Sequence, residues 1–152
     1  MFIDKTDKET ILKPLQVVIG IVERKQALPI LSNVLIEKEP GKIRFTATDL
    51  EIQITTSIEG KAGDGETSAI TVGGKKIQEI LRILPDQSKI SIEAKENKAQ
   101  IKSAKSRFSL QTLPAQDFPK LSNQLAGAKK ITLGQLALKK LLLSVQYAMA
   151  QQ

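Results

Sequence analysis

The chain has 152 residues, of which 41% are hydrophobic and 26% are charged. This composition is typical of a globular protein and excludes a wholly disordered chain. The sequence contains no cysteine and no histidine, which excludes disulfides, thiol nucleophiles and imidazole chemistry. No apolar run is long enough to span a membrane, and the N-terminus lacks a signal-peptide core, so we expect an intracellular protein.

The formal net charge of +7 comes from 23 basic and 16 acidic residues. Residues 73–110 carry nine basic and four acidic groups, and residues 119–152 carry five basic groups and no acidic group. Such segregation predicts one basic face and a polyanionic partner, although a basic chain can also be merely soluble. Aromatic residues are only 3% of the chain, so the stacking platforms of single-strand binders are nearly absent.

An amphipathic helix is expected over residues 11–22, because their apolar side chains recur at helical spacing. Asp7 is a candidate N-cap. Pro14 predicts an irregular first turn or a late start, since an interior proline loses a hydrogen bond and clashes with the carbonyl of Thr10. Short alternating segments follow and predict antiparallel strands. They span residues 34–36, 43–48 and 52–58.

The same order then repeats. A strand at 68–72 leads into a helix that opens at Gly73 and is stopped by Pro85, and three more strands are expected at 89–94, 99–103 and 107–111. Two successive units of one strand, one helix and three strands indicate an internal βαβββ duplication and an α+β fold class. We expect the two helices to pack side by side on one face.

The end of the chain predicts a different arrangement. Residues 114–123 contain two prolines and little periodicity, which is typical of an extended linker. Residues 130–133 predict a strand, and the apolar spacing that follows predicts a helix up to Met149. This is the beginning of a third unit, so we expect the chain to be a fragment of a longer protein.

Three local patterns allow chemistry but also have plainer interpretations. Gly73-Gly74-Lys75-Lys76 lies at a strand-to-helix junction, where it forms either an anion site or an ordinary glycine turn. Thr48-Asp49-Leu50-Glu51 offers two carboxylates, for which turn hydrogen bonding is expected rather than metal binding. Ser109 lies among lysines, and a Ser–Lys hydrolase is a formal alternative that an outward-facing strand residue explains better.

Several stretches together resemble one family. They are LKPLQ at 12–16, LPILSN at 28–33, TDLE at 48–51, SRFSLQTLP at 106–114 and DFP at 117–119. In register over essentially the whole chain, they are similar to the start of the bacterial sliding clamp, the β subunit of DNA polymerase III. A standalone basic α+β module that binds nucleic acid without forming a ring is the alternative.

The resemblance implies a DNA-clamp fold with antiparallel sheet outside and two helices on the inner face. Residues 1–122 would be the first clamp domain, 123–127 a linker and 128–152 the truncated start of the second domain. It also implies a non-catalytic, cofactor-free and metal-free processivity factor, cytoplasmic and nucleoid-associated. Its partners would be duplex DNA, bound without sequence preference, and, through the full-length protein, the replicative polymerase and the clamp loader. The full-length family member is a homodimeric ring, whereas this fragment is expected to be monomeric.

Site residues also follow from the resemblance. Those expected to contact DNA are Arg24, Lys25, Lys75, Arg82 and Gln152. Those expected at the protomer interface are Lys76, Lys98, Lys105, Arg107, Phe108 and Leu110. Residues 105–110 would form an edge strand that extends the sheet across the interface. Lys25, Lys98 and Lys105 stand where the family often has arginine, so bidentate contacts are replaced by point charges.

Overall fold

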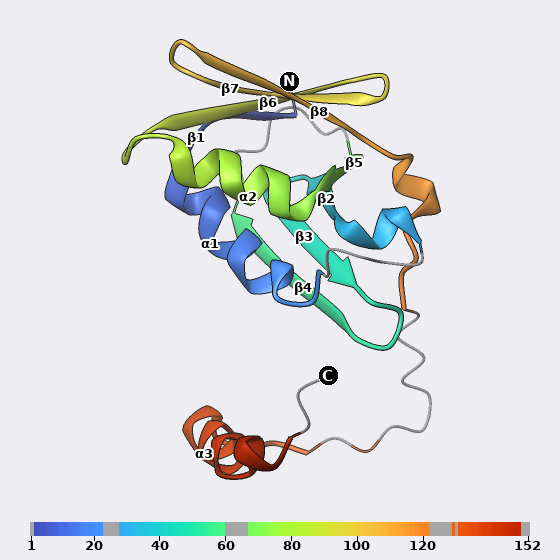
Figure 1. The fold of residues 1–152 in the computed structure, drawn as a ribbon, viewed down its shortest axis with the longest axis vertical. Helices are drawn as coiled ribbons and strands as arrows, with labels where there is room; N and C mark the ends of the chain where they lie inside the picture. The colour runs from blue at the N-terminus through green and yellow to red at the C-terminus, as the bar shows by residue number, and fades with distance from the viewer. Residues whose placement is uncertain (1, 23–27, 60–66, 122–128, 130, 150–152) are drawn as a thin grey trace. The chain divides into compact units, whose positions relative to one another are not determined.

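The computed structural model describes residues 2–22, 28–59, 67–121, 129 and 131–149. The chain separates into two compact units, Met1–Leu121 and Ser122–Gln152, and each is described by itself. The first unit contains all the strands found in the described residues (Figure 1). Arg24, Lys25 and Gln152, three of the five expected DNA contacts, lie outside the described residues.

The first unit repeats one order of elements twice. Its elements in chain order are β1 (Ile3–Asp7), α1 (Lys8–Ile19), the 3₁₀ helix η1 (Pro29–Ser32), β2 (Asn33–Glu39), β3 (Lys42–Thr48), β4 (Gln53–Glu59), β5 (Ser68–Gly73), α2 (Gly74–Ile83), β6 (Lys89–Lys95), β7 (Lys98–Ser103), β8 (Ser106–Gln111) and the 3₁₀ helix η2 (Ala115–Asp117). The predicted duplication of a βαβββ unit and the α+β class are therefore confirmed.

The two halves exchange their first strands. One sheet, sheet A, has the order β1-β6-β7-β8, and the other, sheet B, has the order β4-β3-β2-β5. Every neighbouring pair is antiparallel. Each half thus completes the sheet of the other half, a pairing that the sequence pattern does not predict.

The core lies between the sheets and the helices. Helices α1 and α2 contact each other, as expected, and lie side by side in Figure 1. Strand residues alternate, so that Val34 and Ile36 in sheet B and Ile90 and Ile92 in sheet A point into one continuous apolar cluster. We call the opposite side of each sheet its outer face.

The late start that Pro14 allowed as one alternative for the first helix is not observed. Helix α1 begins at Lys8 and continues through Pro14, which is buried within it. Burial of Pro14 and the side chains around it outweighs the hydrogen bond that proline removes. Asp7 occupies the N-cap position without a side-chain cap bond; its carboxylate instead lies 2.8 Å from Lys89 Nζ.

The second unit has little described structure. It contains α3 (Gln135–Val145) and the 3₁₀ helix η3 (Gln146–Ala148), which confirms the predicted helix. Residues 131–133 are not in a strand, contrary to expectation, because a strand needs a partner and the described part of this unit offers none. Among the described residues, no helix is long and apolar enough to cross a membrane.

Candidate nucleic-acid and assembly interfaces

Helix α2 places two expected DNA contacts on one side. Its apolar residues Ile77 and Leu81 are fully buried, whereas Arg82 is exposed and Lys75 is half-buried. A separation of seven residues puts Lys75 and Arg82 on the same helix face, so the structure brings them together. Lys13, which the sequence analysis did not single out, is exposed on the neighbouring helix α1. Its position opposite the apolar stripe of that helix follows from the spacing of the apolar residues.

The start of α2 depends on a close approach of its backbone. A Cβ atom on Gly74 would lie 3.0 Å from Val34 Cγ2 and 3.5 Å from Ile19 Cγ1. Gly74 therefore allows α2 to pack against both β2 and α1, which fixes where Lys75 and Lys76 emerge. This packing accounts for Gly74 and favours the ordinary glycine turn over an anion site.

Strand β8 is an open edge of sheet A, as expected. Phe108 and Leu110 lie opposite Ile101 and Ala99 of β7, face the core side and are half-buried. Arg107, in contrast, is exposed on the outer face. The strand therefore presents an apolar row on one side and charge on the other.

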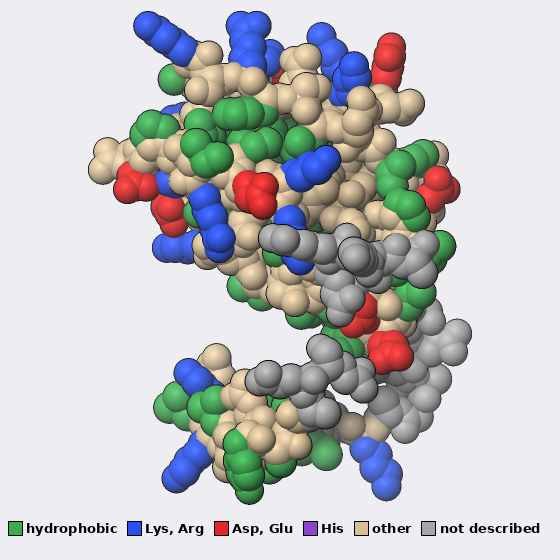
Figure 2. Space-filling model, in the orientation of Figure 1, with side chains coloured by type: hydrophobic (Ala, Val, Ile, Leu, Met, Phe, Trp, Pro, Cys, Tyr) green, Lys and Arg blue, Asp and Glu red, His purple; other side chains and the backbone are tan. Residues whose placement is uncertain are grey.

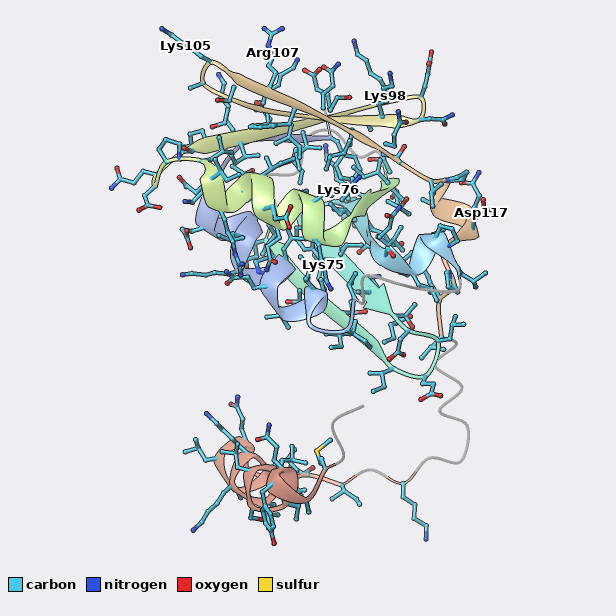
Figure 3. All side chains as sticks on the ribbon, viewed as in Figure 1. Lys75, Lys76, Lys98, Lys105, Arg107 and Asp117 are labelled. Atoms are coloured by element: carbon cyan, nitrogen blue, oxygen red, sulfur yellow. The ribbon has the colours of Figure 1, made fainter. Side chains whose placement is uncertain are left out.

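The basic interface candidates gather on the hairpin of β7 and β8. Lys98, Lys105 and Arg107 are all exposed, and Figure 3 shows them along the same side of sheet A. Lys76 is exposed at the start of α2, and α2 contacts β8. The structure thus brings three of the four basic candidates onto one hairpin and places the fourth on the helix that contacts its edge strand.

The other edge of sheet A is interrupted. In β1, Lys5 has a φ of +38°, and the pairing with β6 shifts register between Ile3 and Thr6. A bulge of this kind bends an edge strand and hinders pairing with another chain. Strand β8 pairs without a shift from Ser106 to Gln111. Of these two edges, β8 is therefore the one suited to accept a further strand.

The positive charge is divided between two surfaces, contrary to the prediction of one basic face. Of the nine basic residues in 73–110, three lie on α2 and six lie on sheet A or its turns. Basic side chains cluster along the edge of the molecule formed by β6, β7 and β8 in Figure 2. Lys102 lies opposite Arg107, and Lys95 lies opposite Lys98. Directly opposed like charges destabilise a sheet.

Two basic residues of sheet A have a carboxylate partner within the described residues: Lys89, which pairs with Asp7, and Lys102. Lys102 Nζ lies 2.7 Å from Glu93 Oε2, and this hydrogen bond lowers the pKa of Glu93, opposed by partial desolvation of the carboxyl group. Lys98, Lys105 and Arg107 have no ion-pair partner within the described residues. Their charge is available to a partner.

The acidic turn at 48–51 is built by its own hydrogen bonds. Asp49 Oδ1 accepts the backbone N–H groups of Ile52 at 2.7 Å and Glu51 at 2.9 Å, and the bond from Ile52 is the largest cause of the lowered pKa of Asp49. The turn role predicted for this motif is confirmed. Within the described residues no cluster of acidic side chains could hold a metal ion. Ser109 is exposed and lies opposite Gln100 on β7, which favours the strand-surface interpretation over a Ser–Lys nucleophile.

The first unit is an α+β domain of the DNA-clamp class. The features that define this class are two βαβββ units, interlocked antiparallel sheets, paired helices and an open basic edge strand. The family model described as "DNA polymerase III beta subunit, N-terminal domain" matches residues 4–122. The chain belongs to this family.

Comparisons with individual proteins support this family assignment. The chain is 42% identical over 147 residues to the beta sliding clamp of Pseudomonas aeruginosa, a match that covers 95% of this chain and 39% of that protein. It is 37% identical over 142 residues to a beta sliding clamp of Vibrio harveyi, which covers 93% of this chain and 97% of that one. A crystal structure of the P. aeruginosa DNA polymerase III subunit beta bound to griselimycin is similar with a TM-score of 0.88 at 39% identity, covering 97% of this chain and 39% of that chain. The chain thus spans about two fifths of the length of the first of these relatives.

Proposed function

We propose that the chain is part of a sliding clamp, a non-catalytic processivity factor that encircles duplex DNA and tethers the replicative polymerase. The observation that carries this proposal is the match to beta sliding clamps along 95% of the chain. Residues 1–122 would be the first clamp domain, 123–127 the linker and 128–152 the start of the second domain. The whole protein would act in the cytoplasm, associated with the nucleoid, with the clamp loader and the polymerase as partners.

DNA binding is assigned to the helix face and the segments near it. Lys75 and Arg82 would attract phosphates from α2, with Arg24, Lys25 and Gln152 contributing from outside the described residues. Helix side chains that attract phosphates without reading bases would hold duplex DNA and still let the protein slide. Lys13 on α1 is a further member of this group, because it is exposed on the helix that contacts α2.

Ring closure is assigned to the open edge of sheet A. Strand β8 would pair with a strand of the partner protomer, and Phe108 and Leu110 would extend the apolar layer across the junction. Lys76, Lys98, Lys105 and Arg107 would meet acidic groups of the partner. A polypeptide of these 152 residues alone is expected to be monomeric in dilute solution.

A titration of duplex DNA tests the assigned binding face. Lys75→Glu with Arg82→Glu should weaken sequence-independent binding, and affinity of the parent chain should fall steeply with salt because phosphate attraction dominates. Lys42→Glu with Arg44→Glu is the matched control, since it changes the net charge equally on the outer face of β3, opposite the core residues Ile43 and Phe45. Equal losses for both pairs would contradict a helix-lined DNA face.

A second experiment separates encirclement from simple attraction. The full-length protein, loaded on nicked circular duplex, should stay bound at a salt concentration that releases phosphate-bound proteins, and it should be lost when the circle is cut. Release from circular and linear DNA at the same salt concentration would refute the ring and favour a standalone nucleic-acid-binding module.

A further inference from the structure

The chain after β8 does not leave the first unit directly. Thr71, on β5, holds Leu113 by two bonds: its Oγ1 donates to the Leu113 carbonyl at 2.7 Å and accepts from the Leu113 N–H at 3.0 Å. The helix η2 that follows also contacts β5. The extended linker expected from residue 114 onward is therefore wrong as far as Leu121, because these residues are anchored to a sheet.

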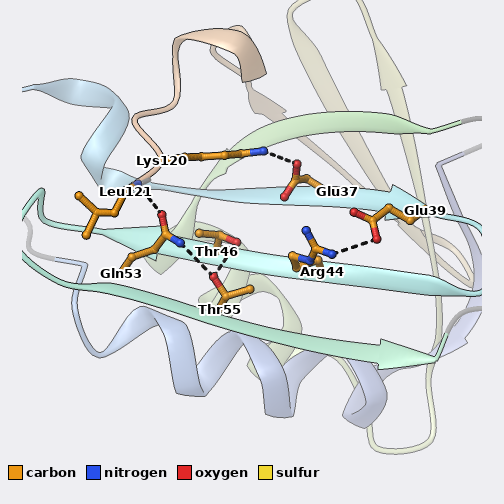
Figure 4. A network of polar contacts seen from close by, with 8 residues as sticks. All are labelled: Glu37, Glu39, Arg44, Thr46, Gln53, Thr55, Lys120 and Leu121. Atoms are coloured by element: carbon orange, nitrogen blue, oxygen red, sulfur yellow. Dashed lines mark hydrogen bonds and ion pairs between the residues drawn. The ribbon is translucent and has the colours of Figure 1, made fainter. Parts of the chain in front are cut away.

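Two further anchors lie on the other strands of sheet B (Figure 4). Lys120 Nζ lies 2.6 Å from Glu37 Oε1 on β2, and the Leu121 N–H donates to Gln53 Oε1 on β4 at 2.9 Å. Since the strand order is β4-β3-β2-β5, the segment Leu113–Leu121 runs over the outer face of sheet B from one edge strand, β5, to the other, β4. We call this segment the strap.

The strap also has an apolar anchor. Phe118 is 4% exposed, although it lies outside the main apolar cluster. Leu35 is on the outer face of β2, between the core residues Val34 and Ile36, and is only 1% exposed. Burial of an outer-face leucine and of a strap phenylalanine indicates that strap and sheet cover each other's apolar surface.

We propose that Gln53 and Glu37 are positioning residues that hold the end of the strap on sheet B and so fix where the chain leaves the first unit. The contacts are local to this unit, and the inference does not depend on DNA binding. Release of residues 119–121, which follow the buried Phe118, would lengthen the connection between the two units by three residues, or up to about 11 Å of reach. The anchors therefore limit the volume that the second unit can sample.

The geometry distinguishes the two anchors. The Glu37 side chain is 15% exposed and the Lys120 side chain 53%, so the ion pair is partly shielded from water at one end. Gln53 uses its carbonyl oxygen for the strap, while its amide nitrogen lies 3.5 Å from Thr55 Oγ1, a long contact. Gln53→Glu keeps the acceptor that the strap needs, whereas Gln53→Ala removes it.

Hydrogen exchange and proteolysis on the 152-residue chain test the anchors. In Gln53→Ala with Glu37→Gln, the Leu121 amide should exchange about tenfold faster, and trypsin should cut the Lys120–Leu121 bond faster by a similar factor, because the closed state has lost the acceptor for Leu121 and the charge attraction for Lys120. Gln53→Glu alone should leave Leu121 protected. Gln100→Ala with Glu39→Gln is the control, since neither residue bonds the strap. Unprotected Leu121 in the parent chain, or equal exchange in variant and control, would overturn the proposal.

A distance measurement between the two units tests whether the anchors position the end of the strap or only protect the Leu121 amide. The chain has no cysteine, so Lys42→Cys and Lys139→Cys offer clean spin-label sites in the first and second units. The distribution of label distances should broaden in the Gln53→Ala, Glu37→Gln background and stay unchanged in the control background. Faster Leu121 exchange with an unchanged distance distribution would overturn the positioning role.

Discussion

Gly74 begins α2 where a Cβ atom would lie 3.0 Å from Val34 Cγ2, closer than an ordinary van der Waals contact. We expect Gly74→Ala to lower the free energy of unfolding by about 1–2 kcal/mol, because overpacking against Val34 and Ile19 outweighs the better helix propensity of alanine. Gly73→Ala is the matched control, since its nearest neighbours would lie 3.7–3.8 Å away, at ordinary contact distance. Urea unfolding of both variants measures the difference, and equal effects would show that the contact at 3.0 Å relaxes freely.

Lys8 connects the start of α1 to the end of α2. Its side chain is 5% exposed, and Nζ donates to the Leu84 carbonyl at 3.0 Å and to Asp86 Oδ1 at 2.7 Å. Leu84 is the C-cap of α2, so the ammonium group satisfies a carbonyl that the helix leaves free. Lys8→Met should therefore lower the free energy of unfolding by about 1–3 kcal/mol, measured by thermal unfolding, because a buried carbonyl loses its donor. A loss as small as that of the exposed Lys13→Met would contradict this role.

The same contact makes stability depend on pH. The hydrogen bond from Lys8, and then its charge, lower the pKa of Asp86 below the ordinary value of 3.8. A depressed folded-state pKa stabilises the protein above the unfolded value, and this stabilisation disappears as pH falls through the lowered pKa. The difference in free energy of unfolding between the parent and Asp86→Asn should be constant from about pH 7 to about pH 5 and shrink below about pH 4. A difference that persists unchanged at about pH 2 would exclude the ion pair as its source.

At the scale of elements, β8 carries a half-buried apolar row on one face and an exposed polar row on the other. Phe108 is half-buried against the core, whereas Arg107 beside it is exposed. We expect Phe108→Ala to lower the free energy of unfolding by about 1–3 kcal/mol and Arg107→Glu by less than about 0.5 kcal/mol, because one loses apolar contacts and the other mainly loses surface charge. Chemical denaturation distinguishes them, and a small effect of both would mean that Phe108 serves only assembly.

The periodicity of apolar residues predicts the helices and strands of this chain but not which strands are neighbours. The order of strands and helices followed from periodicity, because alternation and helical spacing report which side chains are buried. The exchange of β1 and β5 did not follow, because period-two alternation does not say which strand is the neighbour. The strap was missed because Pro114 and Pro119 remove regular periodicity, while its anchors Lys120–Glu37 and Leu121–Gln53 join ordinary residues 83 and 68 positions apart in the chain.

The candidate interfaces were also predictable only in part from the sequence. The resemblance placed Lys98, Lys105 and Arg107 in one group. The structure shows why they lie close together, because a tight hairpin joins β7 and β8. The division of positive charge between α2 and sheet A could not be read from the net charge of a segment. It depends on which side of each element faces outward.

At the scale of the whole first unit, the exchanged strands should make the two sheets unfold together. Sheet A needs β1 from the first half, sheet B needs β5 from the second half, and both contribute to one apolar cluster. Ile92 is fully buried in β6 opposite Ile3 of β1. Ile92→Ala should lower the free energy of unfolding by about 2–5 kcal/mol as a cavity mutation, and it should destabilise sheet B as much as sheet A. Residue-resolved NMR during urea unfolding measures this, with the amides of Phe45 and Ile101 as probes of the two sheets. Coincident midpoints for the two probes, shifted equally by the mutation, are expected. A sheet A probe that unfolds at lower urea than the sheet B probe would show that the βαβββ halves remain separate folding units despite the exchange.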